Sequence, residues 1–595
     1  MDKDSLSTVK LIRGIWRHIS FRRRLQMSAL LIAMLASGVA ELISLGSVIP
    51  FLVVLSDPDI LWDQTYIRSA ATSIGFSEAS QLLIPSIICF ALAAIIAAGV
   101  RLSNIWLNGE LVASIGSDLS CEAYKRTLYQ PLLVHVQRNS STVIAASTSQ
   151  ISMTVAAINA ILQSVTSAVV SIGLLTGLLI IDASIAAAAA LIFGTAYSLL
   201  AVTVNKELRV NSYKIADATK EQLRALQEGL GSIRDLLLDG SQSTYIDIYR
   251  RADRPQRLLQ AKNSYLSSFP RYSLEALGMV VISMLGGFLV VQKGSGAAVI
   301  PTLGALALGA QRLLPALQQV YGGWAALKSY NADMYGVLNM LNQPLPKIID
   351  KITPLAFEKK IVLKNVSFRY TEQSELILNN IDVDIQHGQR IGLIGATGSG
   401  KSTMIDVIMG LLPPTEGDLL VDGRKINNES ESNLIESWRA TIAHVPQSIY
   451  LADTSIAENI AFGVPKAKID LERVQLAAQQ AQISSFVESS DQGYNSHVGE
   501  RGIRLSGGQR QRIGIARALY KQANILVFDE ATSALDTNTE KSVMTAINSL
   551  SSQLTIILIA HRLSTVAGCD KVIELSKGKV QRTIYPSQSP TTFQI

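Results

Sequence analysis

A glycine-rich loop between an apolar run and a helical pattern can hold phosphate groups. Residues 395–403 read GATGSGKST, which fits the pattern G-x-x-x-x-G-K-[ST]. Glycines let consecutive backbone N–H groups turn inward, and the helix that follows adds its positive end. We expect Lys401 to reach the outer phosphates, Ser402 to hold Mg²⁺ and Thr403 to support the phosphate cradle. The loop predicts a nucleoside triphosphate site, with contacts from Gly395, Thr397, Gly398, Ser399, Gly400, Lys401, Ser402 and Thr403.

A pair of carboxylates follows a second apolar run, and this arrangement suits metal binding and hydrolysis. Residues 525–530 read ILVFDE, so a buried strand would end in Asp529 and Glu530. Asp529 would then lie near Mg²⁺, and Glu530 could polarise the water that attacks a phosphate. The alternative is a pair that caps a helix. The strand pattern and the glycine loop together favour the hydrolytic interpretation.

Three further side chains have roles that depend on these two motifs. Gln447, in the run HVPQ, carries an amide that could contact Mg²⁺ and the attacking water. Tyr370 ends the run VSFRY and could stack on an adenine ring. His561 follows another apolar run and could contact the terminal phosphate. Each residue also has an ordinary structural explanation, so these roles are assigned only together with the glycine loop.

The run LSGGQ at 505–509 supplies a second site for an anion. Its serine and glycines begin another helical pattern, and the N-terminus of a helix attracts phosphate. Because the chain already has a phosphate loop, a second anion site suggests a nucleotide held between two domains. With these motifs in place, residues 358–580 resemble the nucleotide-binding domain of an ABC transporter, and LSGGQ resembles the signature of that family.

This resemblance implies a role for each matching residue. Tyr370 corresponds to the adenine-stacking aromatic residue, and Gln447 corresponds to the residue of the Q-loop. Glu530 matches the catalytic carboxylate and His561 the switch histidine. Asp536 lies in the run SALD, which resembles the D-loop that crosses the dimer interface. The resemblance implies ATP with Mg²⁺, held by Ser402, Gln447 and Asp529, and adds the signature residues Ser506, Gly507, Gly508 and Gln509 to the ATP site.

The first half of the chain has the composition of a membrane protein. Mean hydropathy over the 595 residues is +0.27, and 17% of the residues are charged. We predict six membrane spans of about 20 residues or more, at about 25–55, 81–108, 150–181, 183–205, 274–293 and 296–327. The net charge of +6 accompanies basic residues that flank these spans, which favours membrane topology over nucleic-acid binding. The 3 cysteines lie far apart and predict neither a disulfide framework nor a zinc site.

Charge asymmetry predicts the orientation of the spans. The connection after the first span is acidic, whereas the connection at 206–271 is rich in arginine and lysine. By the positive-inside rule, both ends of the chain and the ATPase domain lie in the cytoplasm. We expect no cleaved signal. The predicted domains are an amphipathic interfacial segment at 1–24, a transmembrane domain with cytoplasmic helical extensions at 25–341, a linker at 342–357 and a nucleotide-binding domain with a short tail at 358–595.

Six spans followed by one ATPase resemble an ABC exporter half-transporter. The predicted fold class is therefore a multi-domain membrane protein, with an all-α six-helix transmembrane domain before an α/β P-loop ATPase domain of the ABC type. The resemblance implies a homodimer in which each ATP lies between Lys401 of one subunit and Ser506 of the other. ATP would close the dimer and hydrolysis would release it, which gives alternating access.

A few charged residues in the membrane half indicate where a cargo could bind. Arg101, Arg271 and Arg312 lie within or at the inner ends of predicted spans, and Glu41 lies in the first span. Intramembrane charges are costly, so they tend to face a cavity or pair with each other. Three arginines lining one cavity would suit a phosphate or pyrophosphate. The alternative is that Arg101 and Arg271 reach the cytoplasmic interface and Glu41 neutralises one of them.

Two short runs narrow the predicted cargo. FPRY at 269–272 and QRLLP at 311–315 resemble segments of bacterial flippases that turn a polyprenyl-pyrophosphate-linked glycan across the inner membrane. The resulting prediction is ATP-driven export or flipping of an anionic lipid-linked saccharide across the bacterial inner membrane. One alternative cargo is a peptide or a hydrophobic compound. A different alternative is a membrane protein that ATP gates or regulates without transport, and the intact Glu530 argues against it.

Overall fold

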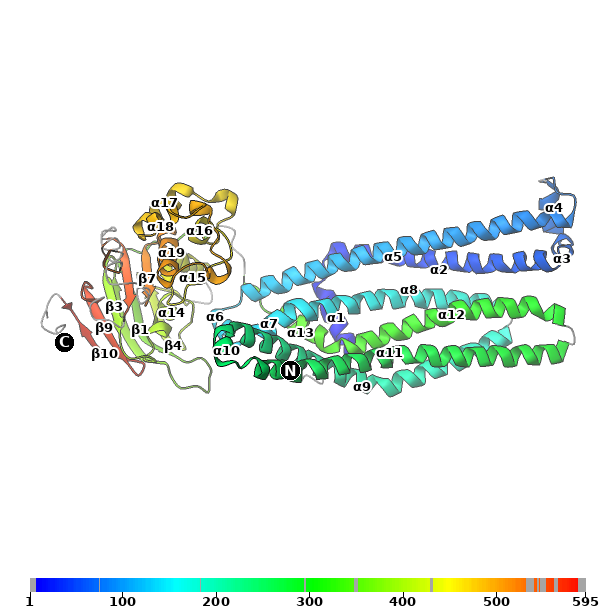
Figure 1. Cartoon of the computed structure of the whole chain (residues 1–595), viewed down its shortest axis with the longest axis horizontal. Coiled ribbons are helices and arrows are strands. Elements are labelled where there is room, and N and C mark those ends of the chain that lie inside the picture. Colours follow the sequence, from blue (N-terminus) through cyan, green and yellow to red (C-terminus); the bar gives the residue numbers. More distant parts are fainter. Residues whose placement is uncertain are drawn as a thin grey trace. The chain divides into compact units, whose positions relative to one another are not determined.

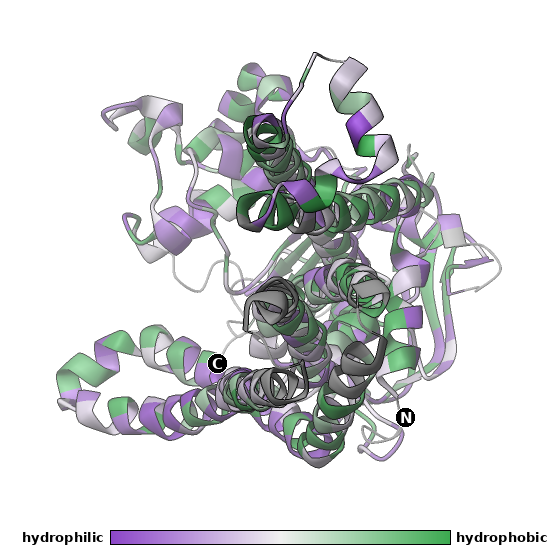
Figure 2. Ribbon diagram, turned by 90° about the vertical axis from the view of Figure 1, so that its right-hand side faces the viewer, coloured by the Kyte–Doolittle hydropathy of each residue, from purple (hydrophilic) through white to green (hydrophobic). Residues whose placement is uncertain are grey.

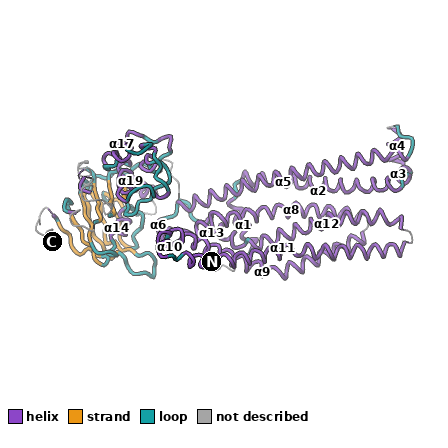
Figure 3. Tube along the Cα trace, viewed as in Figure 1, coloured by secondary structure: helices purple, strands orange, loops and turns teal. Residues whose placement is uncertain are grey.

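The chain folds into two compact units. One unit comprises Met1–Gln130 and Arg138–Pro344, and the other comprises Pro131–Gln137 and Leu345–Ile595. Figure 3 distinguishes a helical unit from one that contains both strands and helices. The computed structural model describes residues 7–73, 75–181, 183–293, 296–346, 352–427, 432–530, 540–542, 545, 553–560 and 566–586.

The helical unit is built on six helices of more than 30 residues within the described ranges (Figure 1). They are α2 (Phe21–Ser56), α5 (Leu83–Leu128), α8 (Ile151–Ile181), α9 (Ala183–Gly231), α11 (Gln242–Lys293) and α12 (Gly296–Ser329). Shorter helices are α1 (Thr8–His18), α3 (Asp59–Trp62), α4 (Thr65–Ser73), α7 (Ser140–Ala145), α10 (Ile233–Asp239) and α13 (Asn331–Leu341). The predicted class, a helical membrane domain before an α/β domain, is confirmed.

Several of the long helices expose apolar side chains that suit lipid. Within the described residues, three helical stretches are long and apolar enough to cross a membrane: Phe21–Leu55, Ala79–Leu128 and Ser140–Gly177. Ile32 on α2 and Ile96 on α5 are among the many large apolar side chains left exposed. Figure 2, which views these helices nearly end-on, shows green hydrophobic residues on several of them. Many exposed apolar side chains on helices of this length match a hydrocarbon environment.

Beyond their apolar parts, α5, α9 and α11 continue as polar helices. Helices α9 and α11 pack against each other there through amides, because Asn211 Nδ2 donates to Asn263 Oδ1 at 2.8 Å and both residues are buried. Gln222 on α9 likewise donates to Asp253 on α11 at 2.7 Å. The predicted polar connections are therefore helical extensions whose partners satisfy their buried polar groups.

The amphipathic N-terminal segment forms α1, but its apolar side faces protein. Leu11 and Ile15 are buried with residues of α13, including Val337 and Leu341, in one core of the helical unit. The exposed apolar residues of α1 include Val9 and Trp16. Helical periodicity identified the element correctly, but it does not tell a protein core from a membrane surface, because both select the same apolar stripe.

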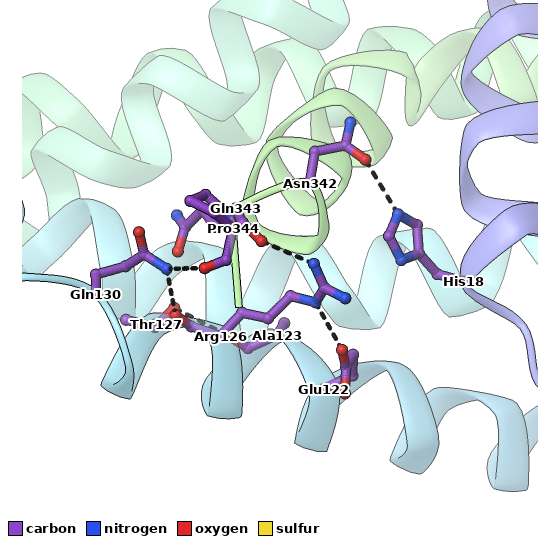
Figure 4. Close-up of polar contacts among 9 residues, drawn as sticks. All are labelled: His18, Glu122, Ala123, Arg126, Thr127, Gln130, Asn342, Gln343 and Pro344. Atoms are coloured by element: carbon purple, nitrogen blue, oxygen red, sulfur yellow. Dashed lines mark hydrogen bonds and ion pairs between the residues drawn. The ribbon is translucent and has the colours of Figure 1, made fainter. Parts of the chain in front are cut away.

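Side-chain hydrogen bonds join the residues just after α13 to the C-terminal end of α5 (Figure 4). The Arg126 guanidinium donates to Gln343 O at 2.7 Å and to Glu122 Oε1 at 2.6 Å. The Gln130 amide donates to Pro344 O at 2.9 Å. Gln130 and Pro344 are the residues at which the chain leaves the helical unit for the other unit. Side-chain hydrogen bonds thus tie together two exit points that are far apart in sequence.

Asp333 is a buried carboxyl near the start of α13, and it predicts a pH-dependent stability. Burial raises its pKa from 3.8 to about 7, although Lys220 acts in the opposite direction. As pH rises from about 4 to about 7, the unfolded chain releases a proton that the folded chain keeps, so the folded state loses stability. We expect Asp333→Asn to raise the melting temperature by a few degrees at pH 8 and by clearly less at pH 5. Equal shifts at both pH values would contradict this.

The second unit contains two sheets. An antiparallel sheet has the order β2-β1-β4-β5, and a six-stranded, mainly parallel sheet has the order β10-β9-β3-β8-β7-β6. The strands are β1 (Lys360–Phe368), β2 (Leu378–Gln386), β3 (Arg390–Ile394), β4 (Glu416–Val421), β5 (Arg424–Lys425), β6 (Ile442–Val445), β7 (Ile525–Asp529), β8 (Thr555–Ile559), β9 (Lys571–Ser576) and β10 (Lys579–Ile584). Because β3 and β7 both run parallel to β8, their carboxyl ends lie at the same edge of the sheet.

Helices complete two cores around these sheets. The helices are α6 (Leu132–Gln137), α14 (Lys401–Ile408), α15 (Ser432–Ala440), α16 (Ile456–Ile460), α17 (Leu471–Gln480), α18 (Ser484–Glu488) and α19 (Gly507–Tyr520). One core joins α14 to the faces of both sheets, and the other gathers α16, α17 and α19 beside β6 and β7. The helix α6 comes from the first half of the chain, and its Leu132 and Leu133 pack against the first of these cores.

Candidate functional site

The glycine loop follows β3 directly and requires glycine at its ends. At Gly395 φ is +148°, and a Cβ there would lie 2.2 Å from Leu575 O. At Gly400 φ is +102°, and α14 begins at the next residue. A side chain at either position would be strained or would clash. Ser399 Oγ is buried without a hydrogen-bond partner in the described part of the chain. The loop therefore has the backbone form and the unmatched hydroxyl that suit a bound phosphate.

Lys401 lies inside this loop. Its Nζ donates to Gly395 O at 2.8 Å and to Ala396 O at 3.1 Å, and the residue is 6% exposed. Burial lowers the pKa of its ammonium, while Glu530 and Asp529 act in the opposite direction. A buried ammonium that donates to neutral carbonyls gains strongly from an added negative charge. The lysine is thus placed where phosphate oxygens are expected.

The predicted carboxylate pair and Gln447 are brought together. Asp529 is the last residue of β7, in register with Ile559 of β8. Glu530 follows with φ of +51°, and its Oε2 accepts from Gln447 Nε2 at 2.7 Å. A positive φ is unusual at a residue other than glycine, and such strained positions cluster at functional sites. The amide orients a carboxylate that can accept a proton from water.

Sequence reasoning missed two residues of this region. Gln511, on α19 just after the signature run, is buried and donates to Glu530 O at 3.4 Å. Asp406, on α14, has its pKa raised to about 6 by burial and, to a lesser degree, by Asp529. Asp406 lies one turn after Ser402 on α14, and only the packing of this helix brings it near Asp529.

The signature run forms a helix cap. Ser506 Oγ accepts from Gln509 N at 3.2 Å, and Gln509 Oε1 accepts from Ser506 N at 2.8 Å. This reciprocal arrangement is a capping box, and it fixes the start of the 14-residue helix α19. Ser506 is exposed, so the positive end of a well-defined helix faces outward. The geometry suits an anion presented by another surface.

Tyr370 lies at the end of β1 beside a helix contributed from the first half of the chain. Its ring packs edge-on against Phe368, with 5.1 Å between the ring centroids, and is partly exposed. Its carbonyl oxygen accepts from Gln137 Nε2 of α6 at 2.7 Å. Thus a partly exposed aromatic residue is available for stacking. His561 and Asp536 lie outside the described residues.

In the helical unit, a cavity of about 730 Å³ is lined by α2, α5, α8 and α12. Arg101 and Glu41 both line it, with 3.6 Å between Arg101 Nη1 and Glu41 Oε1. Arg271 does not line this cavity; its guanidinium lies 5.7 Å from the ring centroid of Tyr272. The side chain of Arg312 lies outside the described residues. Of the three predicted arginines, the structure places Arg101 in the cavity, paired as the alternative interpretation anticipated.

Comparison with known proteins defines the class. The family model described as ABC transporter matches residues 378–533, which include the glycine loop and the signature run. An ATP-dependent lipid A-core flippase from Chromohalobacter salexigens is 30% identical over 493 residues, which cover 81% of this chain and 82% of that protein. The chain belongs to the ABC transporters. More specifically, it has the arrangement of an exporter half-transporter, in which a helical membrane domain precedes an ATP-binding ABC domain.

Two further similarities agree with this class. The heterocyst differentiation ATP-binding protein HepA of a Nostoc species is 34% identical over 390 residues, which cover 64% of this chain and 62% of HepA. The chain therefore spans less than two thirds of that relative. A bacterial Atm1-family ABC exporter with ATP bound has the same fold, with a TM-score of 0.77, 22% identity and coverage of 96% of each chain.

Proposed function

We propose that this exporter moves an amphipathic, anionic lipid-linked saccharide across the bacterial inner membrane. The observation that carries the proposal is the cavity in the helical unit, where Arg101 and polar side chains share the lining with apolar ones such as Val170 and Leu174. A lipid with a charged sugar head needs both kinds of surface. The name of the Chromohalobacter relative, a lipid A-core flippase, supports a glycolipid cargo.

The ATP site of this proposal uses the residues described above. The glycine loop and Lys401 would hold the phosphates, and Ser402, Gln447 and Asp529 would hold Mg²⁺, which suits hydroxyl, amide and carboxylate oxygens. Bound Mg²⁺ would neutralise charge that develops on the phosphates. Glu530 accepts the proton of the attacking water. Tyr370, His561 and Asp536 complete the proposed site, together with the signature residues of the partner.

The proposed assembly is a homodimer in the bilayer with two composite ATP sites. Each phosphate loop would meet the exposed N-terminus of α19 in a second copy, because an exposed capped helix end offers an unused anion site. The amide of Gln130 and the guanidinium of Arg126, which tie two exit points of the helical unit together, would help to transmit closure to the membrane helices. The proposed orientation has both termini and the ATPase domain in the cytoplasm.

The cargo can be tested directly in proteoliposomes. We expect ATP-dependent movement of a fluorescent polyprenyl-pyrophosphate-linked disaccharide, measured by its accessibility to a membrane-impermeant quencher. The matched control is Glu530→Gln, in which movement should be lost. Mass spectrometry of lipids that copurify with the protein should show enrichment of a glycolipid. Movement or ATPase stimulation only with a peptide or a hydrophobic compound would replace this cargo with the alternative one.

A further inference from the structure

Several residues that line the membrane cavity are polar, uncharged and buried. Ser44, Asn104 and Asn108 line it and are 1%, 5% and 7% exposed. Ser44 Oγ, Asn104 Oδ1 and Asn108 Oδ1 are buried and have no hydrogen-bond partner among the residues that the structure describes. Buried polar atoms are nearly always paired in proteins, since an unpaired one destabilises the fold. Three such atoms in one cavity point to a ligand that supplies the missing bonds.

Amides on two facing helices organise this cavity. Asn104 and Asn108 are one turn apart on α5, and Asn159 and Gln163 are one turn apart on α8, so each pair shares a helix face. Asn108 Nδ2 donates to Asn159 Oδ1 at 2.8 Å, and Gln163 Nε2 donates to the same oxygen at 3.4 Å. These four amides, which we call the amide row, therefore present both hydrogen-bond donors and acceptors.

The two charged residues of the lining form a pair, in which Arg101 is exposed and Glu41 is buried. The Arg101 side chain is 61% exposed, and Glu41, at 3.6 Å, balances its charge. The other lining residues are neutral. Neutral amides and hydroxyls match hydroxyl groups of a ligand better than they match a phosphate, which prefers arginine. The volume of about 730 Å³ is within the usual size of a small-molecule site.

We propose that the amide row binds the sugar hydroxyls of the cargo, while the exposed Arg101 meets its phosphate. This inference rests on the proposed function and assigns the sugar and the phosphate to different side chains. Asn104, Asn108 and Gln163 then decide which saccharides are accepted. A ligand without hydroxyls would leave the buried polar atoms of Asn104 and Asn108 unpaired, and such sites discriminate strongly against it.

Two commercially available lipids separate the sugar from the phosphate. Purified protein is incubated in mixed micelles with digalactosyldiacylglycerol or with phosphatidic acid of the same acyl chains, and bound lipid is counted by native mass spectrometry. We expect Asn104→Leu to reduce retention of the sugar lipid by about tenfold without affecting the phosphate lipid. Arg101→Gln should do the reverse. Gln163→Met, at an exposed position, should also weaken sugar binding and is a second variant if Asn104→Leu does not fold.

The matched control is Asn211→Leu. Asn211 is a buried asparagine like Asn104, but it donates to Asn263 and does not line the cavity, so this variant should retain both lipids. Retention of the sugar lipid by Asn104→Leu and Gln163→Met at the wild-type level would overturn the assignment, as would equal loss of both lipids. Flipping assays test the role of the amide row separately from the proposed function. Sugar-lipid binding without ATP-driven movement contradicts only the function, whereas movement that ignores both substitutions contradicts only the amide row.

Discussion

Replacing Glu530 with glutamine is expected to lower ATP turnover by about a hundredfold or more while ATP still binds. The carboxylate is the acceptor for Gln447 Nε2 at 2.7 Å and follows the end of β7, the strand whose carboxyl end lies at the same sheet edge as the glycine loop. Glutamine has nearly the same shape but cannot accept the proton of the attacking water. The phosphate loop and Lys401 are untouched, so nucleotide affinity should change little. Phosphate release and equilibrium ATP binding measure the two effects separately.

A conservative change elsewhere in the same domain controls for stability. Glu472 is an exposed glutamate near the start of α17, and Glu472→Gln should leave turnover at the wild-type rate. Wild-type hydrolysis by Glu530→Gln would remove Glu530 as the catalytic base. Loss of ATP binding in that variant would instead assign the glutamate to the structure of the site.

The phosphate site could be predicted from sequence because its parts are contiguous. The glycines and Lys401 occupy one short loop, and a strand and a helix on either side define its geometry. Glu530 and Gln447 are far apart in sequence, yet each follows a strand, and parallel strands of one sheet end at one edge. The local sequence pattern, together with the rule that parallel strands end at one edge of a sheet, was sufficient to predict the phosphate site.

The cavity in the membrane domain could not be predicted in the same way. Asn104, Asn108 and Asn159 lie in apolar sequence, where a single amide is unremarkable, and only the packing of α5 against α8 brings them together. Arg271 is the opposite case. Its charge led to the prediction that it lines the cavity, but on α11 it lies beside Tyr272 and outside the lining. Helix rotation and pairing depend on many weak contacts between distant segments, which periodicity within one segment does not encode.

The remaining question is whether one ATP site uses one chain or two. The ATPase unit contains the glycine loop, which precedes α14, and the signature helix α19 (Figure 1). A composite site requires these elements to come from different copies, as expected for a two-fold symmetric dimer. Substituting each element in a separate chain distinguishes the two arrangements. Lys401→Ala removes the ammonium, and Gly508→Asp places a negative charge at the start of α19, which favours the helix but repels phosphate.

We expect homodimers of either variant to lose ATP turnover by about a hundredfold. A mixed dimer of one Lys401→Ala chain and one Gly508→Asp chain, isolated with two affinity tags, should recover about half of the wild-type rate, because one of two symmetric sites then combines an intact loop with an intact signature helix. The control has the same substitutions in one chain, paired with a wild-type chain, and should remain inactive because each site then has one defect. If ATP instead bound within a single chain, the results would be reversed. The control would be active through its wild-type chain, and the dimer with one substitution in each chain would be inactive. The two arrangements therefore predict opposite results for the same pair of mixed dimers. This comparison depends neither on how fast the intact site turns over nor on which cargo the transporter carries.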